Sequence, residues 1–180
     1  MKGIVLQLLG RCACEAFGDD TWRQALDAAG AVEPFDPQRT YPDADFNAVV
    51  AALAAARDIS VDDAQRWFGE SAIAHFHAMA PALFDRHQDS WSFLLTLNDL
   101  IHPQVRRDFP GASAPDFGFD ANDEGELVLT YHSARRMCAF AEGLILASMR
   151  HYGDPPVLRH VRCMHRGDTH CEFVLPAPED

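Results

Sequence analysis

Hydrophobic residues recur at helical spacing along most of the first hundred positions. The opening stretch MKGIVLQLLGRCACEAF follows the i, i+3, i+4 rule of an amphipathic helix through Ile4, Val5, Leu8, Leu9 and Cys12. The same periodicity predicts helices over roughly residues 2–17, 20–29, 43–57, 61–80 and 90–108. The loop EPFDPQRTYPDAD separates the second helix from the third, and it offers Asp43 or Asp45 as a helix cap.

The period of the pattern changes after DFPGASAP. The segment DFGFDANDEGELVLTYHS predicts two short strands around an Asn-Asp-Glu-Gly turn, followed by a helix over about 135–151. The last stretch, PPVLRHVRCMHRGDTHCEFVL, predicts a hairpin that turns near Gly167. The sequence therefore predicts an α+β fold, in which an N-terminal helical lobe precedes an antiparallel-sheet/helix lobe. A weak boundary falls near Pro110, and we expect the lobes to share one buried interface.

Composition narrows the possible classes of function. The 180 residues are 48% hydrophobic and carry a formal net charge of −12, which argues against nucleic acid and against anionic lipid as partners. No apolar stretch reaches the roughly 20 residues that span a bilayer, and the N-terminal helix is too amphipathic for a signal peptide. We therefore expect a cytoplasmic protein, whose five cysteines are thiols, metal ligands or redox groups.

A histidine lies on the apolar stripe of the predicted helix 90–108. The stripe comprises Trp91, Leu94, Leu95, Asn98, Ile101, His102 and Val105. Pro103 removes a backbone donor beside His102 and should bend the helix there. Spacing alone leaves two interpretations, a hydrogen-bonded core histidine or a ligand. The remaining histidines stand on no such stripe, and His75 and His77, two apart on a helix, should face different ways.

Hydrogen-bond donors alternate in the stretch YHSARRMCAF. Tyr131, Ser133 and Arg135 occupy every second position, so on a strand they would share one face. A surface strand could carry this pattern without any function. Together the three side chains could also receive an anion by charge-assisted hydrogen bonds.

Three stretches taken together resemble the H-NOX family, the haem nitric oxide/oxygen-binding domains. These are MKGIV at the N-terminus, LIHPQVRRDFPGASAPDF and YHSARR, and the resemblance extends over almost the whole chain. It implies a single domain over 1–180, with a helical lobe over about 1–65. The haem-binding core and C-terminal α/β lobe would cover about 66–180, with haem b buried between the lobes.

The resemblance also implies roles for individual residues. His102 corresponds to the proximal ligand of the haem iron, for which imidazole is a suitable donor. Tyr131, Ser133 and Arg135 correspond to the residues that bind the haem propionates, and Pro115 corresponds to a proline that presses on the porphyrin. Buried carboxylates are costly unless they receive hydrogen bonds, so this donor set is chemically reasonable.

The distal side of the expected pocket is apolar. Where family members that hold O₂ carry a tyrosine, this chain has Phe140, and the resemblance places four further residues nearby: Val5, Leu9, Ala74 and Leu144. Ordinary core packing would also explain Phe140 and Leu144. Because none of these side chains donates a hydrogen bond, we expect a ferrous haem that binds NO and CO but not O₂.

The expected function is a non-enzymatic NO sensor. Family behaviour implies that NO breaks the His102–iron bond and changes the conformation of the protein. We expect this change to regulate a separate histidine kinase or cyclic-di-GMP enzyme, since 180 residues leave no room for an effector domain. The alternatives are an O₂-binding haem protein, a haem enzyme and a zinc-thiolate redox sensor. The distal side lacks the polar acid–base residues that a haem enzyme would need.

Three cysteines form a candidate metal site. In RHVRCMHRGDTHC a turn at Gly167 places Cys163 opposite Cys171, and Cys138 begins the neighbouring helix. With one histidine they would make a Cys₃His set for tetrahedral zinc. The resemblance to zinc-containing family members implies His160, given a bulge near residue 161, whereas strict alternation favours His165. A Cys163–Cys171 disulfide and three unrelated thiols are the alternatives, and Cys12 and Cys14 are expected to have no ligand role.

Overall fold

Helices form the first half of the chain, close to the predicted positions. The computed structural model describes residues 1–177. The first helices are α1 (Gly3–Phe17), α2 (Asp19–Ala29), α3 (Asp43–Arg57) and α4 (Val61–Met79). The prediction of Asp43 or Asp45 as a cap is wrong: Pro42 is the N-cap of α3, and both aspartates lie in its first turn. There their charge still favours the helix, because it faces the positive end of the helix dipole.

The predicted helix 90–108 is broken into three pieces. After the short α5 (Pro81–Phe84) come α6 (Ser90–Leu94), the π-helical turn η1 (Leu97–Ile101) and α7 (His102–Asp108). The side chain of Asp89 accepts a hydrogen bond from the amide of Ser92 at 2.7 Å and so caps α6.

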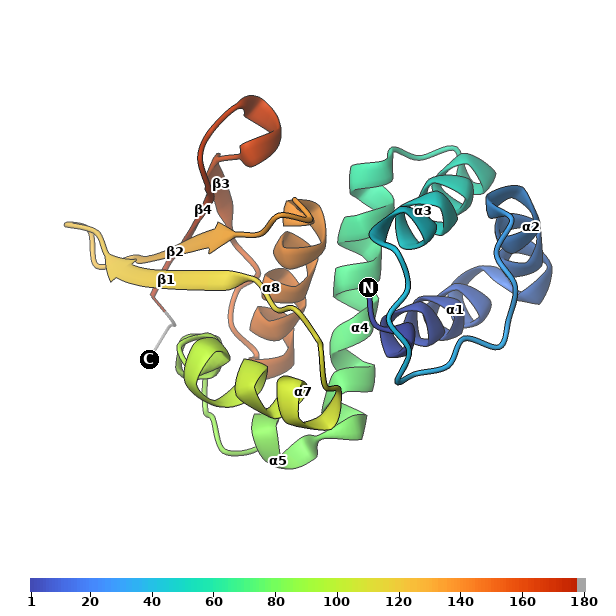
Figure 1. The fold of residues 1–180 in the computed structure, drawn as a ribbon. Coiled ribbons are helices and arrows are strands. Elements are labelled where there is room, and N and C mark those ends of the chain that lie inside the picture. Colours follow the sequence, from blue (N-terminus) through green and yellow to red (C-terminus); the bar gives the residue numbers. More distant parts are fainter. Residues whose placement is uncertain (178–180) are drawn as a thin grey trace.

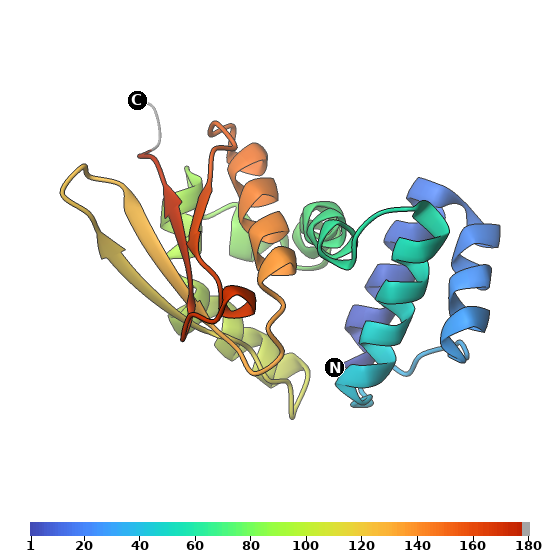
Figure 2. The same cartoon turned by 90° about the horizontal axis from the view of Figure 1, so that it is seen from above.

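The strands in residues 1–177 form one antiparallel sheet in the order β1-β2-β4-β3. Their bounds are β1 (Asp116–Ala121), β2 (Leu127–His132), β3 (Arg159–Arg162) and β4 (Cys171–Leu175). Helix α8 (Cys138–Tyr152) covers one face of this sheet and lies between the sheet and α4, as Figure 2 shows from above. A short 3₁₀ turn, η2 (Met164–Arg166), leads into Gly167, so the hairpin turns where the sequence predicts. The α+β prediction is confirmed.

The buried side chains form two clusters that meet on α4. Residues of α1 to α4 make one cluster, which ends on α4 at Ala72, and the second begins one position later at Ile73 and includes the inner face of the sheet and α8. Phe76 and Leu144 pack against both clusters. The change of period near Pro110 therefore marks where the strands begin and not where the core divides, because Phe84, Phe93 and Leu94 pack with the sheet.

Helix α4 stands at the centre of the molecule, with α1, α2 and α3 on one side and α8 with the sheet on the other (Figure 1). Its backbone approaches that of α8 closely at two glycines. A Cβ atom on Gly143 would overlap the carbonyl oxygen of Arg66, and one on Gly69 would overlap that of Phe140. Within residues 1–177, no helix combines the length and the hydropathy that a membrane span requires.

Candidate functional site

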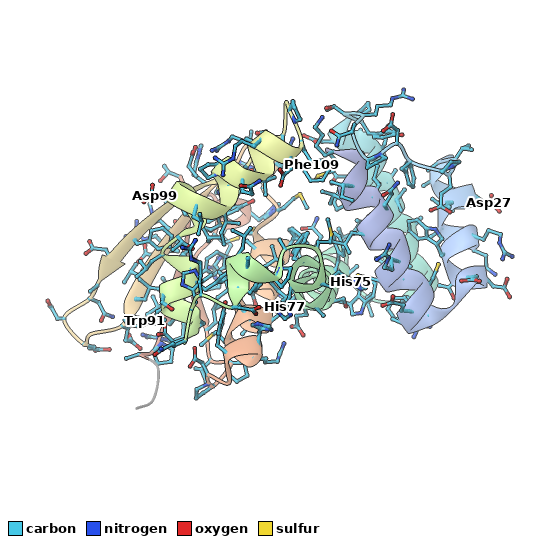
Figure 3. The ribbon with its side chains drawn as sticks, turned by 90° about the horizontal axis from the view of Figure 1, so that it is seen from below. Asp27, His75, His77, Trp91, Asp99 and Phe109 are labelled. Atoms are coloured by element: carbon cyan, nitrogen blue, oxygen red, sulfur yellow. The ribbon has the colours of Figure 1, made fainter. Side chains whose placement is uncertain are left out.

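A widened helical turn precedes His102. The amides of Ile101 and His102 donate to the carbonyls of Thr96 and Leu97, five residues earlier. A proline inside a helix removes one hydrogen bond and clashes with the carbonyl four residues before it, and the wider π turn relieves both at Pro103. Figure 3 shows this segment from below, with Asp99 in η1 and Phe109 directly after α7. A π turn therefore stands where the sequence predicts that Pro103 interrupts the regular helix.

The His102 imidazole is largely buried against strand β1. Its ring stacks on Phe117, with centroids 5.7 Å apart and planes 28° apart. The side-chain amide of Asn98, one turn earlier, donates to the carbonyl oxygen of Phe117 at 2.6 Å and holds η1 against the strand.

Burial, with a smaller contribution from the charge of Arg106, lowers the pKa of His102 to about 4. Its Nδ1 atom is buried and has no hydrogen-bond partner among residues 1–177. His102 is thus a neutral imidazole whose ring nitrogens are not both engaged, which is the form that binds a metal.

The prediction that the three alternating donors share a strand face is wrong, because β2 ends at His132, before Ser133 and Arg135. Tyr131 is the buried member and lies on β2, where its ring packs against Phe117 of β1 with centroids 5.5 Å apart. The strand ends at His132, so Ser133 and Arg135 lie in a turn. The Ser133 hydroxyl accepts a hydrogen bond from the Arg135 amide at 3.2 Å, and this local bond replaces the strand ladder.

Arg135 connects the turn to two other segments. Its Nε donates to Oδ1 of Asp43 at 2.9 Å, and its Nη1 donates to the carbonyl of Ser113 at 2.7 Å. Ser113 lies two residues before Pro115, which is half-buried just ahead of β1. The guanidinium therefore already binds one carboxylate, at the junction of α3, the β1 approach and the turn.

The Tyr131 hydroxyl lies in a poorly solvated place. Burial raises its pKa to about 12, although Ser133 and the backbone of Met137 act in the opposite direction. Tyr131 is therefore a neutral hydrogen-bond donor at any physiological pH.

An apolar group faces α4 from α8. The ring of Phe140 stacks on Phe68, with centroids 4.9 Å apart, and Leu144 lies one turn further along α8. Leu9 is fully buried in the N-terminal cluster, and Val5 packs against that cluster. Phe68 and Phe76 belong to this group as well, and the helical spacing of α4 could have identified them.

Ala74 is not part of this group. It is exposed and lines a surface pocket of about 480 Å³ together with Glu70, Arg150 and other residues of α4 and α8.

His75 and His77 face different partners, as their spacing predicts. His75 lies 3.2 Å from Glu15 of α1, and His77 lies 2.9 Å from Asp85.

Three cysteine thiols converge where α8 begins and at the two ends of the loop that joins β3 to β4. The sulfur atoms of Cys138, Cys163 and Cys171 all lie within 4.8 Å of one another, and those of Cys138 and Cys163 are 3.7 Å apart. All three residues are buried, and burial raises the pKa of Cys138 and of Cys171. The cysteines are free thiols, so the disulfide alternative is wrong for this structure.

His160 and His165 are the two candidates for a fourth metal ligand beside the three cysteines. The pairing of β3 with β4 shifts between His160 and Arg162, which confirms the expected bulge. His160 packs against Phe173, and its Nε2 is buried with no hydrogen-bond partner in the described part of the chain. His165 is exposed, and its Nε2 lies 2.7 Å from the carbonyl oxygen of Arg136. The unpartnered nitrogen favours His160, although no histidine nitrogen in residues 1–177 lies within 4.8 Å of all three sulfurs.

Known proteins resemble this chain in sequence and in fold. The model of a family described as Haem-NO-binding matches residues 2–160. An H-NOX protein from S. oneidensis, solved in the Fe(II)NO ligation state, is 23% identical with a TM-score of 0.90, and 100% of each chain is covered. The H-NOX domain from Shewanella oneidensis in the Fe(II)CO ligation state is 23% identical in sequence, with a TM-score of 0.87 and 100% of each chain covered. An unliganded Fe(II) H-NOX protein from K. algicida is 22% identical in sequence, with a TM-score of 0.83. The match covers 100% of this chain and 98% of that protein. No curated protein matches at a significant level.

Proposed function

This chain belongs to the Haem-NO-binding, or H-NOX, family, and from that membership we propose that it is a haem-based sensor of nitric oxide. The observation that carries the proposal is the neutral, largely buried His102, which has an unpartnered ring nitrogen within the described chain and stands on a π turn. We propose that His102 would hold the iron of a non-covalent haem b. The donor chemistry fits this group, because Phe117, on which His102 stacks, also contacts Tyr131, and Ser133 and Arg135 follow Tyr131 in the next turn.

We assign Tyr131, Ser133 and Arg135 to the haem propionates, and Pro115 to the porphyrin edge. The support is that Arg135 already donates to the Asp43 carboxylate and that Tyr131 stays protonated. Arg135 presents a planar fork of donors, so it can bind a propionate with one side and retain Asp43 or Ser113 with the other.

We propose that the sensor binds NO and CO and excludes O₂. When bound, ferrous haem supplies an open coordination position for a diatomic gas, and bound O₂ needs a hydrogen-bond donor far more than NO or CO does. Phe140, Leu144, Val5 and Leu9 offer no such donor. Ala74 is exposed, and we leave it out of this lining.

Signalling would follow if the binding of NO released His102 from the haem iron. Freed from the iron, His102 would let η1 and α7 move relative to β1, and two states of the segment would differ in affinity for a partner. We propose a separate histidine kinase or cyclic-di-GMP enzyme in the cytoplasm as that partner, and no catalytic activity of this domain itself.

We also propose that a structural zinc ion is held by Cys138, Cys163, Cys171 and His160. Three thiols within 4.8 Å and a buried, unpartnered imidazole nitrogen are the donor set that tetrahedral zinc prefers. A second candidate function is a thiolate redox sensor. The sulfur atoms of Cys138 and Cys163 lie 3.7 Å apart, so an external two-electron oxidant such as a peroxide could join them as a disulfide, with loss of one proton from each thiol.

Replacing His102 with alanine distinguishes the two functions. We expect His102→Ala to lose its spectral response to NO while it keeps its zinc and its response to oxidants. His132→Ala, at an exposed position, should keep both and serves as the control. If His102→Ala binds haem and responds to NO as the unmodified protein does, the assignment of the ligand is wrong.

A further inference from the structure

Glu142 connects the thiol group to helix α4. It lies one turn after Cys138 on α8, and its side chain is only 16% exposed. One carboxylate oxygen, Oε2, lies 3.3 Å from Nδ1 of His160. The other, Oε1, accepts a hydrogen bond from Nε of Arg66 on α4 at 2.9 Å. A row of charged and polar groups thus runs from α4 through α8 to strand β3.

The chemistry of this row determines how His160 can act. A carboxylate only accepts hydrogen bonds, so it selects the imidazole tautomer that carries its proton on Nδ1. The lone pair is then on Nε2, the atom that is buried and unpartnered among residues 1–177. Arg66 donates to the other carboxylate oxygen, Oε1, at 2.9 Å, and this charge-assisted hydrogen bond suits a carboxylate that accepts on both sides.

We propose that Glu142 is the positioning residue of the thiolate metal site: it fixes the tautomer and orientation of His160, and Arg66 holds Glu142 in place. This inference rests on the zinc site proposed above. Carboxylates that accept the second ring N–H of a metal-binding histidine orient the ring and raise its basicity. Within residues 1–177, His165 has no carboxylate partner: its Nε2 lies 2.7 Å from the carbonyl oxygen of Arg136, and its ring is exposed.

The position of Glu142 also connects the thiol group to the central helix α4. Arg66 belongs to the stretch of α4 that packs on Gly143, and its Nη1 bonds Asp63 at 2.8 Å, so its guanidinium is held on two sides. Metal affinity at the hairpin therefore depends on a residue in the central helix.

The test compares two ion pairs that both join α4 to α8. Glu142→Gln keeps the shape but replaces the anion with a weaker, neutral acceptor. Glu70→Gln breaks the other pair, Glu70 with Arg150 at 3.0 Å, and does not touch His160. Zinc affinity is measured by competition with a chromogenic chelator. We expect Glu142→Gln to lose about 10- to 100-fold in affinity, the usual effect of removing such a partner, and Glu70→Gln to keep the affinity of the unmodified protein.

A second measurement does not depend on the variant folding. Nitrogen-15 NMR of the zinc-loaded, unmodified protein reports the tautomer of His160, and we expect a proton on Nδ1 and the metal on Nε2. A proton on Nε2, or equal zinc affinity of Glu142→Gln and the unmodified protein, would overturn the role of Glu142 and leave the zinc site standing. An unmodified protein that binds no zinc would overturn the metal site itself, and this inference with it.

Discussion

Phe140 is the single residue on which the proposed choice of gas depends. Replacing it with tyrosine would place one hydroxyl among apolar side chains while keeping the stacked ring beside Phe68. A hydrogen bond to a charged acceptor contributes about 1.5–3 kcal/mol, or roughly 10- to 150-fold in an equilibrium constant. We expect reduced Phe140→Tyr to form an O₂ complex in air that the unmodified protein does not form, as measured by absorption spectroscopy.

Phe140→Leu is the matched control, because it changes the ring without adding a donor. It should behave like the unmodified protein in air. If both variants gained O₂ binding, pocket volume and not hydrogen bonding would control the selectivity.

At the residue scale, spacing in the sequence identified the candidate site residues but not their hydrogen-bond partners. The alternation of Tyr131, Ser133 and Arg135 was visible in the sequence, yet β2 ends at His132, and the Ser133 hydroxyl accepts a hydrogen bond from the Arg135 amide. Asp43 and Glu142 could not be predicted, because their partners lie 92 and 18 positions away. Only the packing of distant segments creates these pairs.

Among the elements, the most informative difference is the π turn before His102. Apolar spacing predicted one helix over 90–108, and that spacing is real, but Pro103 cannot join a regular helix without a local adjustment. The sequence could predict a bend and could not predict its form. In the β3–β4 hairpin the form of the irregularity was predicted as well: a bulge was expected near residue 161, and the register shift between His160 and Arg162 confirms it.

The crossing of α4 and α8 depends on two glycines. Gly143→Ala would gain roughly 1 kcal/mol in helix propensity, but its Cβ would overlap the backbone of Arg66. Forcing atoms into a packed interior costs about 1–3 kcal/mol or more, and a backbone atom cannot move aside as a flexible side chain can.

We therefore expect Gly143→Ala to be less stable by thermal denaturation, with Tm lower by about 2–4 °C for each kcal/mol lost. Ala74→Ser, at an exposed position of α4, is the control and should lower Tm only slightly, because Ser and Ala differ by only a few tenths of a kcal/mol in helix propensity. An unchanged or higher Tm for Gly143→Ala would mean that the two helices separate more easily than their contact suggests.

The β3–β4 hairpin is the element that the proposed zinc site should stabilise. We expect the purified protein to contain zinc in equal amount to the chain, and removal of the metal by a chelator to lower Tm. Cys138→Ser should lose the metal, because one of three thiols is gone. Cys14→Ser should keep it, because Cys14 lies outside the cluster. Substoichiometric zinc that a chelator removes without lowering Tm would argue against a structural role.

For the whole molecule, the notable feature is how weakly the His102 segment is anchored. Among the described residues of η1 and α7, none is fully buried, whereas α4 and α8 contribute many side chains to the two cores. Segments with few buried contacts open most easily. We therefore expect the proposed His102–iron bond to be the main contact that holds η1 and α7 in place.

Hydrogen exchange tests this view of the switch. On addition of NO to the reduced protein, we expect faster amide exchange over about residues 97–115 and unchanged exchange in α2, which lies on the far side of the helical lobe (Figure 2). Uniform exchange with and without NO would show that release of His102 does not loosen the segment.

The central claim is that this protein holds a ferrous haem on His102 and distinguishes NO from O₂. The most direct measurement is the absorption spectrum of the reduced protein, recorded first in air and then after addition of NO. We predict no oxygen complex in air, and with NO a spectrum of five-coordinate iron from which His102 has been released. A stable oxygen complex would contradict the proposed selectivity, and a colourless protein that takes up no haem would contradict the account as a whole.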